Sequence, residues 1–189
     1  MCQTGSIVIK ICIVYLSSGI IQHMHGTILD GAQLMSKEMA LPASWQTKMM
    51  KIVLVGGCFD VLHYGHVKFL ESAKARGDLL VVALENDEFI RKRKKREPFH
   101  TLEQRAEILT NLRSVDAVIC LPTFTTTKEY IEFVSIIKPS IIAVTSGDTH
   151  LSEKKQCAEA VGSEIIEVCD LVPGLSSSTL LNYAHLLHD

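Results

Sequence analysis

From residue 50 onward, short runs of apolar residues alternate with longer segments whose apolar positions recur at helical spacing. Runs of five or six residues rich in Val, Ile and Leu predict buried strands, and the segments between them predict helices. The predicted strands are 51–56, 79–84, 116–120, 140–145 and 164–168. The predicted helices are 65–76, 101–112, 127–137, 152–161 and 177–187.

This alternation predicts an α/β fold with a doubly wound, five-stranded parallel sheet covered by helices on both faces. Right-handed crossovers place the strands in the spatial order 116–120, 79–84, 51–56, 140–145, 164–168. Ligands of such sheets bind beyond the carboxyl ends of the strands where the winding reverses. Here that point lies between the strands 51–56 and 140–145, each of which is followed by small, polar, turn-forming residues. We therefore expect a binding crevice there.

The first 49 residues do not follow this pattern. Residues 7–16 are apolar but contain Lys10, and a spanning helix needs about 20 apolar residues. A secretory leader requires basic residues near its start, and this segment has no charge before Lys10. Because Met49 and Met50 directly precede the first strand, we predict one domain over 50–189 that keeps its fold when the chain begins at Met50. Residues 1–49 are then a poorly docked extension or a mis-annotated start, and the alternative is an added strand or helix that packs on the domain or a partner.

Composition limits the function classes. A chain of 189 residues is enough for one domain with its own core. Its net charge of −2 gives no overall attraction to nucleic acid or to an anionic membrane. The six cysteines include no C-x-x-C pair, so reduced thiols and a cytoplasmic location are expected.

Residues 56–66, Gly-Gly-Cys-Phe-Asp-Val-Leu-His-Tyr-Gly-His, lie at a predicted strand-to-helix turn. They place His63 and His66 at a helix N-terminus, whose free N–H groups and positive dipole end favour phosphate. The alternatives are a structural histidine pair, or two metal ligands with Cys58 as a third. Near the C-terminus, residues 174–179, Gly-Leu-Ser-Ser-Ser-Thr, precede another predicted helix. They are either a helix cap with spare hydroxyls or a second phosphate-binding N-terminus.

Residues 58–66 resemble the HxGH signature of the cytidylyltransferase-like nucleotidyltransferases, and residues 174–179 resemble the second signature of that family. The resemblance covers residues 50 to about 186 and is nearest to the glycerol-3-phosphate cytidylyltransferases, followed by the heptose-phosphate and FAD-synthesising adenylyltransferases. It implies a Rossmann-like nucleotidyltransferase fold. The implied reaction moves a nucleotidyl group from CTP to a small phosphorylated alcohol, such as glycerol 3-phosphate, and releases pyrophosphate. The alternative donor is ATP, with a heptose phosphate or FMN as acceptor.

The same resemblance implies the partners and the site. Mg²⁺ is expected with the triphosphate, the chain is expected to form a homodimer, and neither nucleic acid nor a membrane is an expected partner. His63 and His66 are the implied catalytic residues. The implied nucleotide-binding residues are Gly57, Cys58, Phe59, Gly65, Gly147, Asp148, Ser176, Ser177, Ser178 and Thr179. The implied phosphate- or acceptor-binding residues are Arg93, Lys94, Lys95 and Arg113.

Two features leave alternatives open. The cytidylyltransferases carry an arginine shortly before their second signature, whereas residues 170–174 here read Asp-Leu-Val-Pro-Gly, which weakens the case for CTP. The basic run 91–96 is also typical of a solvated face or of a nucleic-acid-binding patch, and a nucleic-acid-binding module is the non-enzyme alternative. Among the carboxylates, Asp60 is expected to brace its loop, and Asp87 and Asp148 are candidates for an outer metal role.

Overall fold

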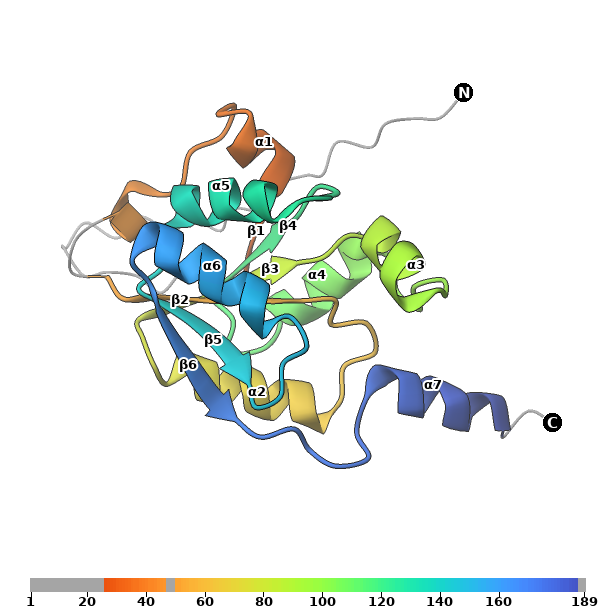
Figure 1. Cartoon of the computed structure of the whole chain (residues 1–189). Helices are drawn as coiled ribbons and strands as arrows, with labels where there is room; N and C mark the ends of the chain where they lie inside the picture. The colour runs from red at the N-terminus through yellow and green to blue at the C-terminus, as the bar shows by residue number, and fades with distance from the viewer. Residues whose placement is uncertain (1–25, 47–49, 187–189) are drawn as a thin grey trace, which may run out of the picture.

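Six strands form one parallel sheet between two layers of helices in the computed structural model, which describes residues 26–46 and 50–186 (Figure 1). The strands are β1 (Thr27–Asp30), β2 (Ile52–Gly57), β3 (Leu79–Leu84), β4 (Ala117–Cys120), β5 (Ile141–Thr145) and β6 (Glu164–Cys169). The helices are α1 (Gly31–Met35), α2 (Tyr64–Lys74), α3 (Asp87–Lys94), α4 (Leu102–Thr110), α5 (Thr127–Ile137), α6 (Leu151–Val161) and α7 (Ser177–Leu186), with a short 3₁₀ helix, η1 (Ala43–Gln46).

The strand order across the sheet is β1-β4-β3-β2-β5-β6. The predicted order of the five strands from β2 to β6 is therefore confirmed, with β2 between β3 and β5 at the point where the winding reverses. The prediction of five strands is wrong, because β1 adds a sixth at the edge beside β4. Its sequence, Thr-Ile-Leu-Asp, is short and has only two apolar residues, so it lacks the apolar run that marks the other strands.

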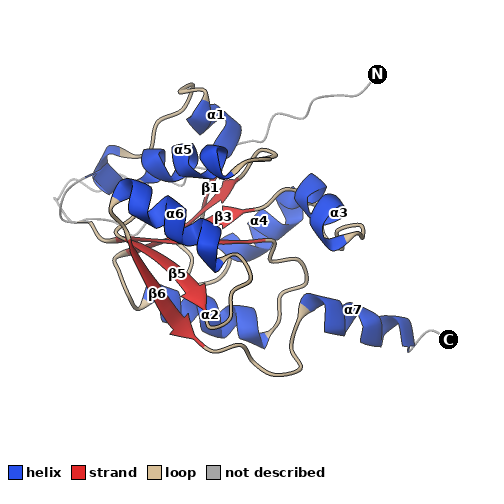
Figure 2. Cartoon of the chain, viewed as in Figure 1, coloured by secondary structure: helices blue, strands red, loops and turns tan. Residues whose placement is uncertain are grey.

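Helices cover both faces of the sheet (Figure 2), and each face carries its own core. Phe133 of α5 and Cys157 of α6 pack on one face together with α1 and η1. Leu70 of α2 and Leu109 of α4 pack on the other. Both faces of the central strands are thus buried, which is why β2 and β3 consist almost entirely of apolar residues. No helix within residues 26–46 and 50–186 is long and apolar enough to cross a membrane.

The described part of the predicted N-terminal extension packs on the domain. Thr27 pairs with Ala117 at the start of the β1–β4 ladder, and Gly31 passes so close to the Cys120 carbonyl that a Cβ atom would lie 2.6 Å from it. Trp45 is only 2% exposed. The prediction that this segment docks poorly is therefore wrong for residues 27–46. The alternative, an added strand or helix that packs on the domain, describes them. Residues 1–25 and 47–49, Met49 among them, lie outside the described residues, and a translation start at Met49 or Met50 stays a prediction.

We predict that Trp45→Ala lowers the free energy of unfolding by about 3–5 kcal/mol, because it removes a large buried side chain and leaves a cavity. Urea unfolding followed by circular dichroism measures this change. Phe99→Ala is the matched control, since the Phe99 side chain is 65% exposed and its loss should change stability by less than about 1 kcal/mol. Equal stability of the Trp45 variant and the wild type would show that the segment before β2 does not support the fold.

Candidate active site

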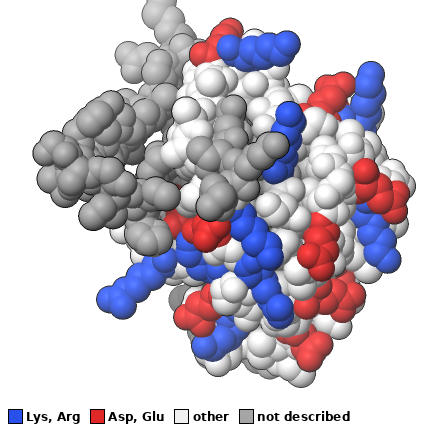
Figure 3. Space-filling view, turned by 90° about the vertical axis from the view of Figure 1, so that its left-hand side faces the viewer, with Lys and Arg blue, Asp and Glu red and all other residues white. Residues whose placement is uncertain are grey.

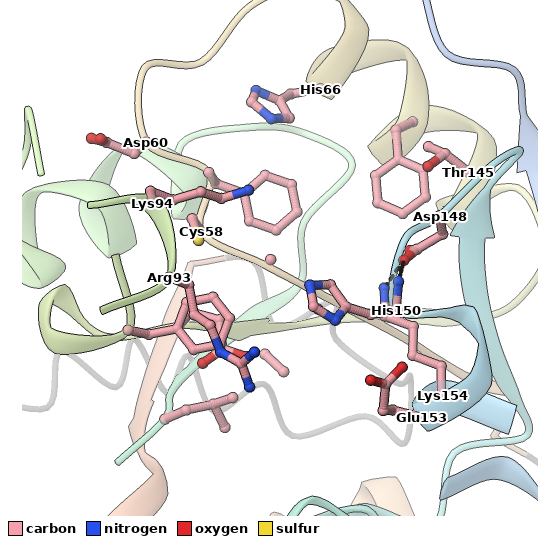
Figure 4. A pocket seen from close by; sticks show the side chains of 18 of the residues that line it. Cys58, Asp60, His66, Arg93, Lys94, Thr145, Asp148, His150, Glu153 and Lys154 are labelled. Carbon is pink, nitrogen blue, oxygen red and sulfur yellow. Dashed lines mark hydrogen bonds and ion pairs between the residues drawn. The ribbon is translucent and has the colours of Figure 1, made fainter. Parts of the chain in front are cut away.

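A cavity of about 520 Å³ opens beyond the carboxyl ends of β2, β3 and β5 (Figure 4). Its walls come from the loop after β2, from α2, α3, α5 and α6, and from residues 170–178. Gly56 and Thr145, at the ends of β2 and β5, both line it. The predicted crevice at the reversal of the winding is therefore present, and its volume is typical of a small-molecule site.

The loop from β2 to α2 has an unusual backbone. Phe59 and Val61 have φ angles of 47° and 60°. Residues other than glycine rarely adopt this left-handed region, and a β-branched residue such as Val61 adopts it at a cost in free energy. Such a conformation persists only where surrounding contacts enforce it. Strained backbone of this kind is frequent at ligand-binding loops, and here it shapes the cavity wall.

Asp60, between the two strained residues, supplies the enforcing contacts. Its carboxylate is 1% exposed, accepts a hydrogen bond from Arg96 at 2.6 Å, and accepts the backbone N–H groups of Phe99 and His100 at 3.1 Å. Burial alone would raise the pKa of Asp60, but these bonds outweigh burial and lower the pKa below its ordinary value. Asp60 therefore braces the loop, as expected from its position.

Arg105 of α4 stabilises the same loop through hydrogen bonds. Its guanidinium is 1% exposed and donates to the backbone carbonyls of Cys58 at 2.6 Å and Glu85 at 2.8 Å. It also pairs with Asp87 at the start of α3, at 2.6 Å. One rigid cation thus joins the segments that follow β2 and β3. The sequence offered no signal for this role, because an arginine in a capped helix is more often a surface residue.

The two histidines stack at the N-terminus of α2. His63 is the N-cap residue and His66 lies in the first turn, with ring centroids 3.8 Å apart. Burial lowers the pKa of both, and burial together with the neighbouring His63 brings the pKa of His66 to about 4. Both rings are therefore neutral at pH 7. Within the described chain neither buried Nδ1 atom has a hydrogen-bond partner, which leaves the pair able to bind a ligand.

The second motif, residues 174–179, lies beside the loop that leads into α2. Ser176 caps α7, since its Oγ accepts the N–H of Thr179 at 3.0 Å. Ser177 Oγ donates to the carbonyl of Val61 at 3.4 Å, which ties the C-terminal motif to the loop after β2. Ser176, Ser177 and Ser178 all line the cavity. Both helix N-termini therefore border one space, although their residues are more than a hundred positions apart.

Charged side chains face each other across the cavity mouth. Arg93 and Lys94 of α3 lie on one wall, and Asp148 and Lys154 lie on the opposite wall (Figure 4). The Lys154 ammonium is 2.7 Å from the Asp148 carboxylate. Although burial would raise the pKa of Asp148, Lys154 lowers it. The walls thus present fixed cations to an anionic ligand.

Most of the predicted site residues line this cavity. These are Gly57, Cys58, Phe59, His63, Gly65, His66, Arg93, Lys94, Asp148, Ser176, Ser177 and Ser178. The structure does not bring Gly147, Thr179, Lys95 or Arg113 to the lining. Lys95 is the exposed C-cap of α3. Arg113 is exposed in the turn before β4, at the end of the sheet opposite the cavity, because a residue just before a parallel strand lies at its amino end.

Sequence reasoning missed a polar pair in the cavity wall, a buried carboxyl group and a partly exposed tyrosine. Glu85 follows β3 directly and is 8% exposed, and the Tyr130 hydroxyl donates to it at 3.0 Å. Burial raises the pKa of Glu85 to about 7. The available signal was its position, since Glu85 stands at the carboxyl end of a strand next to the winding reversal.

The metal alternative for the histidine pair receives no support. Burial, with a smaller effect of Glu85, raises the pKa of Cys58 to about 11. In the described part of the chain, no group of three or more His, Cys, Asp or Glu side chains could hold a metal ion.

We predict that His66 makes the fold less stable as the pH falls. Its pKa is about 4 in the folded protein and 6.5 ordinarily, so between these values the unfolded chain binds the extra proton. The stability contributed by neutral His66 is complete above about pH 6.5. It is lost toward pH 4, at up to about 1.4 kcal/mol per pH unit.

Urea unfolding between about pH 4 and pH 7 measures this slope, which His66→Gln should flatten. Thr110→Ala, a change at the far end of α4 where the hydroxyl donates to the Glu107 carbonyl, should keep the slope of the wild type. If the His66 variant loses stability with falling pH as steeply as the wild type, His66 does not have its pKa lowered in the fold.

Comparison with known proteins identifies a family and relatives of this chain. The family model described as cytidylyltransferase-like matches residues 54–178. The bifunctional protein HldE of Helicobacter hepaticus is 33% identical over 151 residues, which cover 79% of this chain and 30% of that protein. The FAD synthase of Thermococcus kodakarensis is 46% identical over 100 residues, which cover 52% of this chain and 65% of that protein. The chain thus spans less than a third of HldE and about two thirds of the FAD synthase.

Two solved structures share the fold. A lipopolysaccharide core biosynthesis protein of Thermoplasma volcanium matches with a TM-score of 0.52 and 27% identity, over 65% of this chain and 97% of that one. The pantoate-beta-alanine ligase of Francisella tularensis matches with a TM-score of 0.55 over 86% of this chain and 78% of that one, and at 17% identity it shows the fold alone. The family match over residues 54–178 shows that the chain belongs to the cytidylyltransferase-like family.

Proposed function

We propose that the protein transfers an adenylyl group from ATP to a small phosphorylated alcohol and releases pyrophosphate. The observation that carries this proposal is the meeting of two helix N-termini at one cavity. His63 and His66 stand at the first, and Ser176–Ser178 stand at the second. Each N-terminus offers free N–H groups and a positive dipole end, so together they suit a polyphosphate.

The chemistry requires little more than these groups. A phosphate monoester has a second pKa of about 6, so its dianion attacks the α-phosphorus without a general base. The oxygen forms a bond to that phosphorus while the bond to pyrophosphate breaks. The protein must hold the two anions in line and offset the growing negative charge. Arg93, Lys94 and Lys154 supply charge at the mouth, and the neutral histidine pair supplies hydrogen-bond donors within.

The choice of ATP departs from the preference for CTP that the sequence motifs suggested. The FAD synthases among the relatives are named for a product that contains an adenylyl group, and the one from Thermococcus onnurineus is 41% identical over 120 residues. Residues 170–174 also lack the arginine expected beside CTP. Both observations support the adenylyl alternative better than cytidylyl transfer.

Mg²⁺ is the proposed cofactor and would neutralise charge on the triphosphate. The two carboxylates considered for an outer role are already engaged, Asp87 by Arg105 and Asp148 by Lys154. Mg²⁺ bound chiefly through phosphate oxygens and water fits this arrangement, since that cation often needs one or two protein carboxylates at most.

The charge distribution supports an enzyme over a nucleic-acid-binding module. Within the basic run 91–96, Arg91 pairs with Glu97 at 2.9 Å and Lys92 lies 3.4 Å from Glu88. Other members of the run line the cavity. On the face drawn in Figure 3, positive and negative side chains are interspersed. A nucleic-acid footprint would instead gather one sign of charge on one face.

We predict that isothermal calorimetry with Mg²⁺ present detects binding of ATP and at least tenfold weaker binding of CTP. The full chain is titrated with each triphosphate at the same ionic strength. Tighter binding of CTP would restore cytidylyl transfer while leaving the reaction class intact. Binding of neither triphosphate would contradict the proposed function itself.

We predict that His63→Ala and His66→Ala each lower turnover by about 10²–10³-fold, the usual loss when one transition-state donor is removed. Pyrophosphate release measures turnover, and circular dichroism checks that each variant is folded. Thr110→Ala is the control, because Thr110 lies at the far end of α4 and donates only to the nearby Glu107 carbonyl. Wild-type turnover in both histidine variants would show that the pair is structural.

A further inference from the structure

Glu85 is a buried carboxyl group of the cavity wall that the transfer reaction leaves without a role. It follows β3 directly, and its backbone N–H donates to the carbonyl of Gly57 at 3.0 Å. It therefore stands one strand away from the loop that carries the histidines. Because side chains alternate along a strand and Leu84 packs on the core beneath α2 and α4, Glu85 points to the other face, where Tyr130 of α5 contacts it.

The Glu85 carboxyl group has little around it that stabilises a negative charge. In the part of the chain that the structure describes, its one hydrogen-bond partner is the Tyr130 hydroxyl, a neutral donor at 3.0 Å. Asp60, in the wall of the same cavity, instead pairs with Arg96 and accepts two backbone N–H groups. Burial disfavours a charge that is not paired, so Glu85 holds a proton more readily than Asp60 does.

Polar groups act on Glu85 from every element around it. They are Cys58 in the loop after β2, Arg93 of α3, Arg105 of α4, Tyr130 of α5 and Lys154 of α6. Burial raises the pKa of Glu85, whereas the Tyr130 hydroxyl and the three cations lower it, and the pKa stands at about 7. Burial also raises the pKa of Cys58, to about 11, and that of Tyr130. Glu85 is therefore the group in this set that exchanges a proton near neutral pH.

An anion bound in the cavity changes this balance. Arg93 and Lys154 lie on different walls (Figure 4), and in the proposed function they meet a phosphate group. A phosphate beside these cations offsets the positive charge that lowers the pKa of Glu85 and adds a charge of like sign, so the pKa rises further. Protonation of Glu85 removes the repulsion between the two anions and turns the carboxyl group from an acceptor into a hydrogen-bond donor.

The position of Glu85 favours the phosphate of the acceptor over the phosphates of ATP. In the proposed function Ser176–Ser178 hold the departing pyrophosphate, and Ser177 binds the Val61 carbonyl in the loop that leads into α2. Glu85 and Tyr130 lie on the other face of the sheet, which α5 and α6 cover. An in-line displacement places the attacking oxygen and the pyrophosphate on opposite sides of the α-phosphorus, so the acceptor phosphate comes nearest to Glu85.

We propose that Glu85 takes up a proton from the solvent when the phosphate group of the acceptor enters the cavity, and that its neutral carboxyl group then donates a hydrogen bond to that phosphate. This inference rests on the proposed function. Glu85 is a binding residue in this account, since it contacts a phosphate oxygen other than the one that attacks. Because the complex binds one more proton than the free protein, the acceptor binds more weakly as the pH rises above about 7.

Isothermal calorimetry counts the proton directly. The full chain is titrated with glycerol 3-phosphate, ribose 5-phosphate and FMN, and separately with Mg²⁺-ATP, in two buffers whose heats of ionisation differ, HEPES and Tris. The difference in binding heat gives the number of protons taken up. At about pH 7.5 we expect an ester that binds to take up about half a proton, and to bind about five- to tenfold more weakly at about pH 8.5 than at about pH 7. The esters are almost fully dianionic in this range, so they contribute little to the count.

Two variants assign the proton to Glu85. Glu85→Gln keeps the shape of the side chain and offers an N–H donor, but it does not titrate. It should bind the ester at least as tightly as the wild type at about pH 8.5, without proton uptake and without the dependence on pH. Tyr130→Phe removes the hydroxyl that stabilises the Glu85 carboxylate, so the range in which binding weakens should move to higher pH. It serves as the second probe if Glu85→Gln does not fold.

Two further variants are controls at the same cavity. Glu153→Gln makes the matched change at an exposed carboxyl group of the cavity wall, where hydrogen bonds from its own backbone N–H and from Ser152 lower the pKa of Glu153. His150 also lines the cavity, and histidine is the side chain that ordinarily exchanges protons near neutral pH, so His150→Gln is the second control. Both variants should take up as many protons as the wild type.

The outcomes separate the two proposals. No uptake of protons, or their release, when an ester binds overturns the role of Glu85, because its carboxylate would then stay charged in the complex. Uptake that persists in Glu85→Gln overturns it as well and assigns the proton to another group, such as the histidine pair. Uptake with Mg²⁺-ATP alone, or binding of ATP without any ester, removes the acceptor phosphate from this wall and leaves the nucleotide site intact. Binding of neither ATP nor any ester overturns the proposed function and this inference together.

Discussion

A parallel sheet that winds in both directions from one central strand cannot close over the carboxyl ends of its middle strands. The chain leaves β2 toward β3 on one side and reaches β5 on the other, so the crossover connections diverge and leave a gap above β2. Every part of the candidate site reaches this gap from a different element, and none of these elements could form it alone. The topology of the sheet therefore determines where the site lies, and the motifs determine which side chains it contains.

The gap becomes a site because charged groups fix its walls. Arg105 links the segments after β2 and β3 through two backbone carbonyls, and Asp60 fixes the strained loop through Arg96 and two backbone N–H groups. Both charges are buried and fully engaged, and removing one partner of such a group is usually costly. The loop that carries the histidines is thereby preorganised, so a ligand need not supply the free energy to order it.

The sequence predicted the features that depend on local pattern. Apolar runs located five of the six strands, and the spacing of His63 and His66 at a strand-to-helix turn located the cavity. Prediction from the sequence failed where tertiary contacts decide the structure. The strand β1 has too few apolar residues to be recognised, and α3 is a helix of strongly charged residues whose Asn86 cap and buried Ile90 became evident only in the fold. Glu85 and Tyr130 are distant in sequence, so no local pattern could have paired them.

The raised pKa of Cys58 has a consequence for the reactivity of the site. A cysteine beside two histidines and several cations would ordinarily be suspected of being an easily oxidised thiol. At a pKa of about 11, only about one Cys58 thiol in ten thousand is ionised at pH 7, and the thiolate is the form that oxidants and electrophiles attack. Burial thus lowers the reactivity of this thiol. In the proposed function, this keeps the cavity beside the two histidines free of adducts that would block polyphosphate binding under oxidative conditions.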